Sequence, residues 1–450
     1  MLVITNLTVV TMDDQRRILK DAAIAVDGDK IAAVGPAGAL RTRFPDAETM
    51  DGRGLVAIPG LIDTHAHADQ SLLRGLGDGM HWIPFLDRVV SPYLARRDPA
   101  DAVLANTLSM IEMVRSGTTC FVSPNVDPRD DLGGLSQAVA AVGIRAVLCR
   151  FAMPRPGVDS GAAAKAAVTE ASAAMRRWHD GEGGLVKLWF GLDVPRRPGD
   201  TFHPNFYREV AAEARRLGVG ISYHFCSEIE DAAYIQDTFG MRPAEWSRDN
   251  HALGPNVILI NGCWVTPEEI RILSDSGTHL AHSPVANMKM ATGVLPLPDV
   301  LAAGVNVSLG TDGGLNNNTH DMFAEMKAAC LLQNCVRRSP TALTALQALE
   351  LATIHGARAV GRGHELGSIE SGKLADIVLV DLNRAHSVPA HDVVSNLVFT
   401  ANGGNVDTVL IGGRFVLRHG RLDRLDERAV CTQARERAEK IPVELGLPAK

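Results

Sequence analysis

Short apolar runs recur along the central part of the chain, and each is followed by an amphipathic stretch of helical length. The first apolar run ends at residue 67, and further strands are predicted near 118–124, 145–152, 185–192, 218–225, 256–263, 278–283 and 306–312. Helices are predicted between them, for example over 205–217, 267–276 and 320–335. Eight buried strands that alternate with helices over about 300 residues predict a (β/α)8 TIM barrel.

The two ends of the chain have a different pattern, in which short strands are separated by turns. Residues 3–12 and 22–35 alternate between apolar and polar, and the Asp27-Gly28 step is typical of a hairpin. Strand character returns after residue 364, at 375–381 and 407–416. We therefore expect residues 55–363 to form the barrel, and residues 1–54 and 364–420 to join in a small composite β-sandwich domain. The charged segment 421–450 is predicted to form a surface helix.

Composition narrows the function classes. The chain has 450 residues, 46% of them hydrophobic and 22% charged, as in soluble globular proteins. A net charge of −7 argues against binding to nucleic acid or to an anionic membrane surface. No apolar stretch reaches the roughly 18 residues of a membrane span, and the N-terminus lacks the basic region of a signal peptide. Seven cysteines, an odd number in a long chain without a secretion signal, favour reduced thiols and a cytoplasmic location, and the absence of a Cys-x-x-Cys motif argues against a structural zinc site.

Metal-ligand side chains stand at the ends of three predicted strands. His65 and His67 end the first apolar run, His224 ends the run from residue 218, and Asp312 ends the run from residue 305. Alternate positions of an extended chain point His65 and His67 to the same side. Because the C-terminal ends of parallel barrel strands meet at one mouth, all four side chains become neighbours. Three neutral imidazoles and one carboxylate suit Zn²⁺ or Fe²⁺, so the pattern predicts a metal-dependent hydrolase.

Several motifs resemble those of a known family. Pro59–His67 is similar to the first-strand motif of the amidohydrolase superfamily, and Leu72–Leu76, His282–Asn287 and Gly310–Gly313 resemble its cytosine deaminase and triazine hydrolase branch, which includes atrazine chlorohydrolase-like enzymes. Gly367–Asp376 resembles the family's return into the small β-domain. The resemblance covers nearly the whole chain. It implies a homo-oligomer and one divalent metal ion, with His65, His67, His224 and Asp312 as its ligands.

The resemblance also implies roles in hydrolysis. A bound divalent ion can lower the pKa of its water from about 15.7 to about 7, which supplies a hydroxide nucleophile at neutral pH. Asp312 is expected to accept a hydrogen bond from that water. Glu228 is predicted to shuttle protons, although it follows His224 by four residues and the branch usually has three. The alternative for Glu228 is a residue at a helix start, where acidic side chains are favoured.

Asn261 is the clearest departure from the family pattern. It ends the predicted sixth strand, where the family has a histidine that hydrogen-bonds the attacking water or the developing oxyanion. An amide offers a donor and an acceptor but carries no positive charge near pH 7. Either Asn261 orients the substrate, or His282 on the next strand supplies the missing imidazole.

Candidate substrate-binding residues are Trp82, Phe85, Asn287 and Met288, by family analogy. Asn316, in the polar loop after Asp312, could hydrogen-bond a ring substrate or simply cap the following helix. An apolar stripe such as Trp82 and Phe85 is also typical of a core. Binuclear relatives need a carboxylated lysine on the fourth strand. Lys187 stands at the start of that strand and not at its end, so we predict a single metal ion.

The most concrete prediction is hydrolytic deamination of a nitrogen-heterocyclic small molecule, such as a purine, pyrimidine or triazine. A different leaving group on the same carbon gives the alternative, which is dehalogenation or the opening of a cyclic amide. A non-catalytic assembly protein is a third alternative. It is disfavoured because such proteins typically lose metal ligands, and all four are present here.

Overall fold

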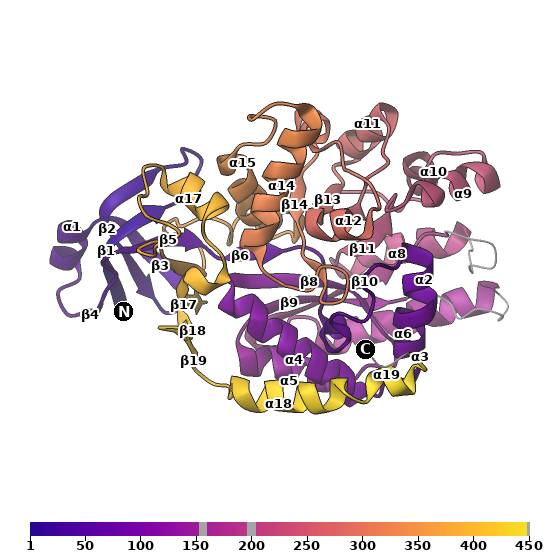
Figure 1. Ribbon diagram of the computed structural model, residues 1–450, viewed down its shortest axis with the longest axis horizontal. Coiled ribbons are helices and arrows are strands. Elements are labelled where there is room, and N and C mark those ends of the chain that lie inside the picture. The colour runs from indigo at the N-terminus through magenta and orange to yellow at the C-terminus, as the bar shows by residue number, and fades with distance from the viewer. Residues whose placement is uncertain (153–159, 196–203, 448–450) are drawn as a thin grey trace.

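The computed structural model describes residues 1–152, 160–195 and 204–447. These residues form a helix-covered barrel and, beside it, a smaller sheet that contains both ends of the chain (Figure 1). The predicted (β/α)8 barrel with a composite β-domain is confirmed. All seven cysteines are free thiols. No helix in the described ranges combines the length and the apolar character that a membrane crossing requires.

The barrel is a parallel sheet of eight strands. Thr64 closes it, because the backbone N–H of Thr64 donates to the carbonyl of Leu309 at 3.0 Å. Beyond that point β7 (Ala66–His67) pairs with β15 (Asp312–Gly313) as a separate two-stranded ladder. In spatial order, the strands are β14 (Val307–Leu309), β13 (His279–His282), β12 (Val257–Asn261), β11 (Ile221–Phe225), β10 (Val186–Leu192), β9 (Arg145–Phe151), β8 (Thr118–Val126) and β6 (Leu61–Asp63).

The helices around the barrel begin and end where the sequence supplies capping groups. At the start of α4 (Pro99–Arg115), the Asp98 carboxylate accepts a hydrogen bond from the backbone N–H of Asp101 at 2.9 Å. Before α11 (Pro267–Ser276), Thr266 and Glu269 form a reciprocal capping box, and Gly277 ends that helix with φ of 69°. Other helices of the barrel layer are α5 (Leu132–Val142), α6 (Ser160–Trp178), α8 (Pro204–Leu217), α9 (Ile229–Phe239), α12 (Pro284–Met290) and α14 (Met322–Arg337).

The smaller domain is one continuous nine-stranded sheet. The predicted hairpin is present, because Asp27 pairs with Lys30 across the turn between β2 and β3. Ile4 and Ile24 from the N-terminal strands share a hydrophobic cluster with Ile377 and Leu410 from the C-terminal strands. The strand order is β19 (Arg421–Leu422), β18 (Arg414–Arg418), β17 (Val406–Ile411), β16 (Ile377–Asp381), β5 (Leu55–Pro59), β1 (Leu2–Val10), β2 (Ile18–Asp27) and β3 (Lys30–Pro36), and β4 (Glu48–Asp51) pairs with β1.

The first apolar run is divided between the two sheets, which differs from the single barrel strand expected from the sequence. β5 pairs with β1 and β16 in the small sheet, whereas β6 pairs with β8 in the barrel. Gly60 lies at the crossing, where a β-carbon would come within 2.0 Å of the Thr119 hydroxyl oxygen. The small sheet therefore extends to Pro59, beyond the domain boundary expected at residue 54.

The C-terminal segment packs along the barrel. Helix α18 (Glu427–Ala438) lies beside α4 (Figure 1). Arg437 binds both carboxylate oxygens of Asp101, at 2.7 and 2.8 Å. Ala434 and Ile441 join Phe85 in one hydrophobic cluster, so the end of the chain supports the segment around Phe85.

A buried ion pair ties the barrel to the small domain. The Arg145 guanidinium, at the start of β9, contacts both oxygens of Asp376 at 2.7 and 3.0 Å. Asp376 also accepts a hydrogen bond from the backbone N–H of Gly412 at 2.8 Å. Both charged side chains are at least nine-tenths buried, so either partner alone would be a buried, uncompensated charge.

We expect Asp376→Ala to lower the free energy of unfolding by about 3–5 kcal/mol, because it leaves the Arg145 charge buried and unpaired. Urea denaturation followed by circular dichroism measures this loss. Arg271→Ala is the matched control, since Arg271 pairs with Glu268 on the exposed face of α11, and such a pair contributes at most about 1 kcal/mol. Equal effects of the two substitutions would contradict the linking role of the buried pair.

Candidate metal centre and its pocket

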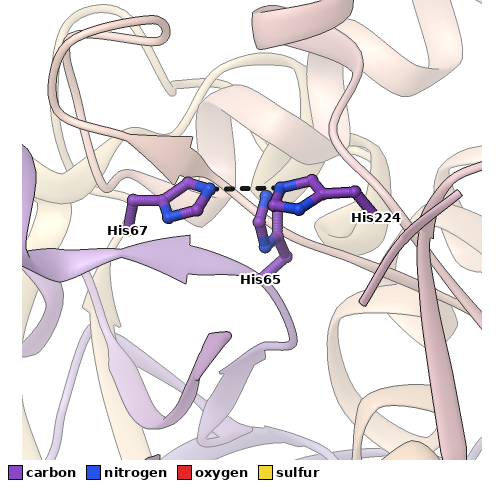
Figure 2. A group of neighbouring side chains, drawn as sticks. All are labelled: His65, His67 and His224. Atoms are coloured by element: carbon purple, nitrogen blue, oxygen red, sulfur yellow. Dashed lines mark hydrogen bonds between the residues drawn. The ribbon is translucent and has the colours of Figure 1, made fainter. Parts of the chain in front are cut away.

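The four predicted metal ligands converge at one mouth of the barrel. His65 lies between β6 and β7, His67 ends β7, His224 lies in β11, and Asp312 begins β15. The ladder between β7 and β15 sets the two ends of the barrel side by side, because the Asp312 N–H donates to the His65 carbonyl at 2.8 Å. Figure 2 shows the three imidazoles turned toward one another.

The distances within this group are those of a shared ligand set. Nε2 of His67 and Nε2 of His224 are 3.2 Å apart. Oδ1 of Asp312 lies 3.2 Å from Nε2 of His65 and 3.6 Å from Nε2 of His67. One nitrogen from each of the three histidines lies within 4.8 Å of the other two. None of the four residues is more than 8% exposed.

The chemistry of these donors fits a divalent cation. Both ring nitrogens of His65 and Oδ1 of Asp312 are buried without a hydrogen-bond partner among the described residues. Burial, together with the adjacent His65, lowers the pKa of His67 to about 4. Burial opposes ionisation of Asp312, yet His65 and His67 hold the pKa of this carboxyl well below its ordinary value. Neutral imidazoles beside an ionised carboxylate are the protonation states that a zinc-type ion needs.

A buried carboxylate behind the ligands fixes their backbone. Oδ1 of Asp63 accepts hydrogen bonds from the backbone N–H groups of His65 at 3.2 Å and Thr311 at 3.0 Å. Oδ2 accepts from the Thr311 hydroxyl at 2.5 Å, and the same hydroxyl lies 2.8 Å from Nδ1 of His320. Asp63 thereby joins the segments that carry His65 and Asp312. No sequence pattern marks Asp63 or His320 as part of the site, although Asp63 stands two residues before His65.

Residues at or just beyond the C-terminal ends of three barrel strands have unusual backbone conformations. Cys226, Asn261 and Asp312 have φ values of 46°, 80° and 61°, in the left-handed region that residues other than glycine seldom adopt. Asparagine and aspartate tolerate this region best. Such conformations cluster at functional sites, where the surrounding packing over-determines them.

A pocket of about 300 Å³ opens beside His67 and His224. Of the predicted substrate-binding residues, it brings together Trp82, Phe85 and Asn316, whereas Asn287 and Met288 are absent from its lining. Trp82 and Phe85 stack on each other with ring centroids 5.9 Å apart. The other lining residues are Asp69, Gln70, Ile83, Leu86, Val90, Ser91, Leu94, Asn125, Asp127, Phe151 and Asp193.

Asn261 takes part in a chain of amide hydrogen bonds. Its Nδ2 donates to the Ser227 hydroxyl at 2.9 Å, and its Oδ1 accepts from Nδ2 of Asn287 at 2.9 Å. Nδ2 of Asn287 also donates to the Thr292 hydroxyl at 3.1 Å. Ser227 stands three residues after His224, so the positions where the family pattern has a glutamate and a histidine hold a serine and an asparagine bonded to each other.

Glu228 and His282 lie outside the described lining of the pocket. Glu228 is the N-cap residue of α9, where the Asp231 carboxylate accepts from the Glu228 backbone N–H at 3.1 Å. His282 ends β13, is fully buried, and has no hydrogen-bond partner for either ring nitrogen within the described part of the chain. Burial lowers the pKa of His282 to about 3. Lys187 forms an ion pair with Asp180 at the start of β10, at the opposite end of the strand from the mouth.

The family model for amidohydrolases, described as "Amidohydrolase family", matches residues 56–416. The chain belongs to the amidohydrolase family. A second model, for the imidazolonepropionase-like composite domain of bacteria, matches residues 22–47 of the small sheet. The motifs that resembled this family in the sequence are therefore those of a true member.

Curated relatives of this amidohydrolase are deaminases. A 5-methylthioadenosine/S-adenosylhomocysteine deaminase of Moorella thermoacetica is 34% identical over 94% of this chain and 96% of that protein. A 5'-deoxyadenosine deaminase of Methanosarcina barkeri is 33% identical over 98% of both chains. These matches agree with the predicted aminohydrolase chemistry.

Solved structures of zinc-containing enzymes share the fold of this amidohydrolase. An adenosine deaminase from Xanthomonas campestris with bound zinc superposes with a TM-score of 0.89, at 30% identity over 98% of both chains. The atrazine chlorohydrolase TrzN from Arthrobacter aurescens, in complex with zinc, has a TM-score of 0.87 at 25% identity, over 97% of this chain and 100% of its own. Both are zinc complexes, in keeping with the donor set described above.

Removing one donor tests the ligand set. We expect His65→Ala to reduce bound zinc from about one equivalent to below about 0.1 equivalent, because three remaining donors bind the ion much more weakly. Plasma emission spectrometry of protein reconstituted with one equivalent of zinc measures the loss. His279→Ala is the control, since His279 lies at the other end of β13 and its ring contacts the Pro255 carbonyl. Full zinc in His65→Ala would contradict the assignment.

The buried neutral state of His282 predicts a pH dependence of stability. A histidine with a pKa of about 3 in the folded protein and about 6.5 when unfolded contributes stability that is complete above pH 6.5 and is lost as the pH falls. We expect the wild type to lose stability relative to His282→Leu between pH 6.5 and pH 4. Urea midpoints of the metal-free proteins at several pH values measure this difference, and a pH-independent difference would contradict it.

Proposed function

We propose that this amidohydrolase removes an amino group by hydrolysis from a nitrogen heterocycle of the purine nucleoside class. The observation that carries the proposal is the buried three-histidine, one-aspartate set, two members of which, His67 and His224, line a pocket of about 300 Å³. Relatives that match nearly the whole chain are named as deaminases of adenosine derivatives, which supports both the reaction and the substrate class.

The residues of the chain have distinct roles in this proposal. His65, His67, His224 and Asp312 would hold a divalent ion, which supplies Lewis-acid activation of water when bound. The Asp312 carboxylate accepts a hydrogen bond from the attacking water. Trp82 and Phe85 offer an aromatic wall to the ring of the substrate.

Proton transfer to the leaving amino group is assigned to Glu228 in this proposal. Support for this assignment comes from its position in the chain, four residues after His224 and at the N-cap of α9. Asn261 and Asn287 lie outside the lining of the pocket, so they would orient the substrate only indirectly, through the hydrogen-bonded chain that they form with Ser227. His282, neutral and buried, is assigned a supporting contact and no charge-carrying step.

A different leaving group is the second candidate. Ser227 and Asn261 occupy the places where the family pattern has an acid and an imidazole, so the described site holds fewer proton donors than that pattern. Chloride leaves without protonation, and TrzN, with 25% identity over 97% of this chain, is named as a chlorohydrolase. This observation favours dehalogenation over ring opening as the alternative.

We expect zinc-loaded protein to release ammonia from at least one member of a panel of adenosine derivatives, aminopyrimidines and aminotriazines. A coupled glutamate dehydrogenase assay measures ammonia, and ion chromatography measures chloride from chlorinated analogues of the same rings. His67→Ala is the inactive control. Chloride release without ammonia would replace deamination by dehalogenation, and the absence of both would contradict the proposal.

Glu228→Gln separates chemistry from metal binding in the same assay. We expect it to keep zinc and to lose about 100-fold or more in kcat, the usual effect of removing a general acid–base group. A near-normal kcat would restrict Glu228 to capping α9.

The homo-oligomeric state and the cytoplasmic location remain predictions, which sedimentation of the purified protein and fractionation of the native host would test.

A further inference from the structure

Asp69 lines the pocket but belongs neither to the metal ligands nor to the residues proposed for proton transfer. It lies in the short 3-10 helix at Ala68–Leu73, two residues after His67, and its side chain lines the pocket. It is 8% exposed, so it is more than nine-tenths buried. A buried carboxylate is costly unless charged or hydrogen-bonding groups satisfy it.

Arg97 holds this carboxylate from behind. Nη2 of Arg97 lies 3.2 Å from Oδ2 of Asp69 and 2.8 Å from Oδ2 of Asp130. The Arg97 side chain is 2% exposed and is absent from the lining of the pocket. One guanidinium nitrogen therefore holds two carboxylates, one of which, Asp69, faces the pocket.

The other carboxylates near the pocket are differently engaged. Both oxygens of Asp127 bind the Arg129 guanidinium at 2.9 Å, and one also accepts the Arg129 backbone N–H. Asp193 accepts the backbone N–H of Val194 at 3.0 Å. For Asp69 the described residues provide an ion pair with Arg97 and no hydrogen bond from a backbone or hydroxyl donor. A carboxylate has about four acceptor sites, so Asp69 keeps acceptor capacity toward the pocket.

Among the described residues, the lining of the pocket contains no lysine or arginine. A ligand that enters this space meets hydrogen-bond acceptors on Asp69 and on Asn125, whose Oδ1 is buried without a partner in the described ranges. Groups that donate hydrogen bonds complement these acceptors, whereas an anionic group would face the Asp69 carboxylate and meet no lysine or arginine on the described wall.

We propose that Asp69 is a specificity-determining residue that accepts a hydrogen bond from an N–H or O–H group of the substrate other than the leaving amino group. This inference rests on the proposed deamination, because it assumes that the substrate occupies the pocket beside His67 and His224. The substrate class is thereby narrowed to heterocycles with a second hydrogen-bond donor. Asp69 orients such a substrate and takes no part in proton transfer.

The test is a comparison of substrates in Asp69→Asn and Asp130→Asn. For the best substrate of the deamination panel, analogues are prepared in which each remaining N–H or O–H donor is methylated or removed in turn. In the wild type, we expect removal of one donor to lower kcat/KM by about 10- to 100-fold, since a hydrogen bond to a charged acceptor is lost. In Asp69→Asn, the parent substrate should lose a similar factor, and removal of that donor should have little further effect.

Asp130→Asn is the matched control, because it removes the other carboxylate partner of Arg97 without changing the pocket wall. It should retain the full discrimination between the parent and the analogue. Zinc content and the circular dichroism spectrum show that both variants are folded. A purely structural role for Asp69 would lower activity toward all analogues equally, and that result would overturn the proposal, as would undiminished discrimination in Asp69→Asn.

Dissociation constants separate this inference from the proposed reaction. If no member of the panel releases ammonia, the proposed function fails, but titration calorimetry with the same series on zinc-loaded protein still tests Asp69. Tighter binding of donor-bearing ligands to the wild type, lost in Asp69→Asn and kept in Asp130→Asn, supports the role. Affinities that do not depend on the donors overturn it.

Discussion

The pairing of the first and last strands of the barrel is the constraint on which the site depends. His65 and His67 stand near one end of the barrel sequence and Asp312 at the other, and the hydrogen bond from the Asp312 N–H to the His65 carbonyl makes them neighbours. Asp63 reinforces this closure by accepting hydrogen bonds from both segments. A barrel that failed to close here would keep its helices and most of its core and would still lack a metal site.

Burial then determines what the closed site can do. The imidazole of His67 is shielded from water, so its neutral, metal-binding form is favoured near neutral pH. The Asp312 carboxylate stays ionised in the same environment because His65 and His67 lie next to it. The protein thus presents a neutral nitrogen donor on His67 and a negative charge on Asp312 to one point in space. The pocket beside them has both apolar walls and hydrogen-bond acceptors, as recognition of a heterocycle requires.

The alternation of strands and helices predicted the barrel, and the positions at the ends of its strands predicted which side chains lie at its mouth. His224 and Asp312 could be assigned to the barrel mouth because each ends an apolar run, and parallel strands place such positions at a single face. The sequence did not predict the division of the run from Leu55 to His67 between two sheets, since no polar residue interrupts it between Leu55 and Ile62. The close approach of Gly60 to Thr119 marks the crossing in the structure.

Side-chain partners were the least predictable feature. The bond between Ser227 and Asn261 joins residues 34 positions apart, and the ion pair between Arg97 and Asp69 likewise joins two separate segments. Such contacts depend on loop geometry that no periodic pattern encodes. The extra residue between His224 and Glu228 was visible in the sequence, but its consequence, a glutamate at the N-cap of α9, required the structure.

The central claim is that one divalent ion binds to these four side chains at the mouth of the barrel. Crystallography of the zinc-loaded protein, with anomalous differences collected at the zinc edge, tests it most directly. The account predicts a single anomalous peak within about 2.0–2.2 Å of one nitrogen each of His65, His67 and His224 and one oxygen of Asp312. A peak elsewhere, or two adjacent peaks at the mouth, would contradict it.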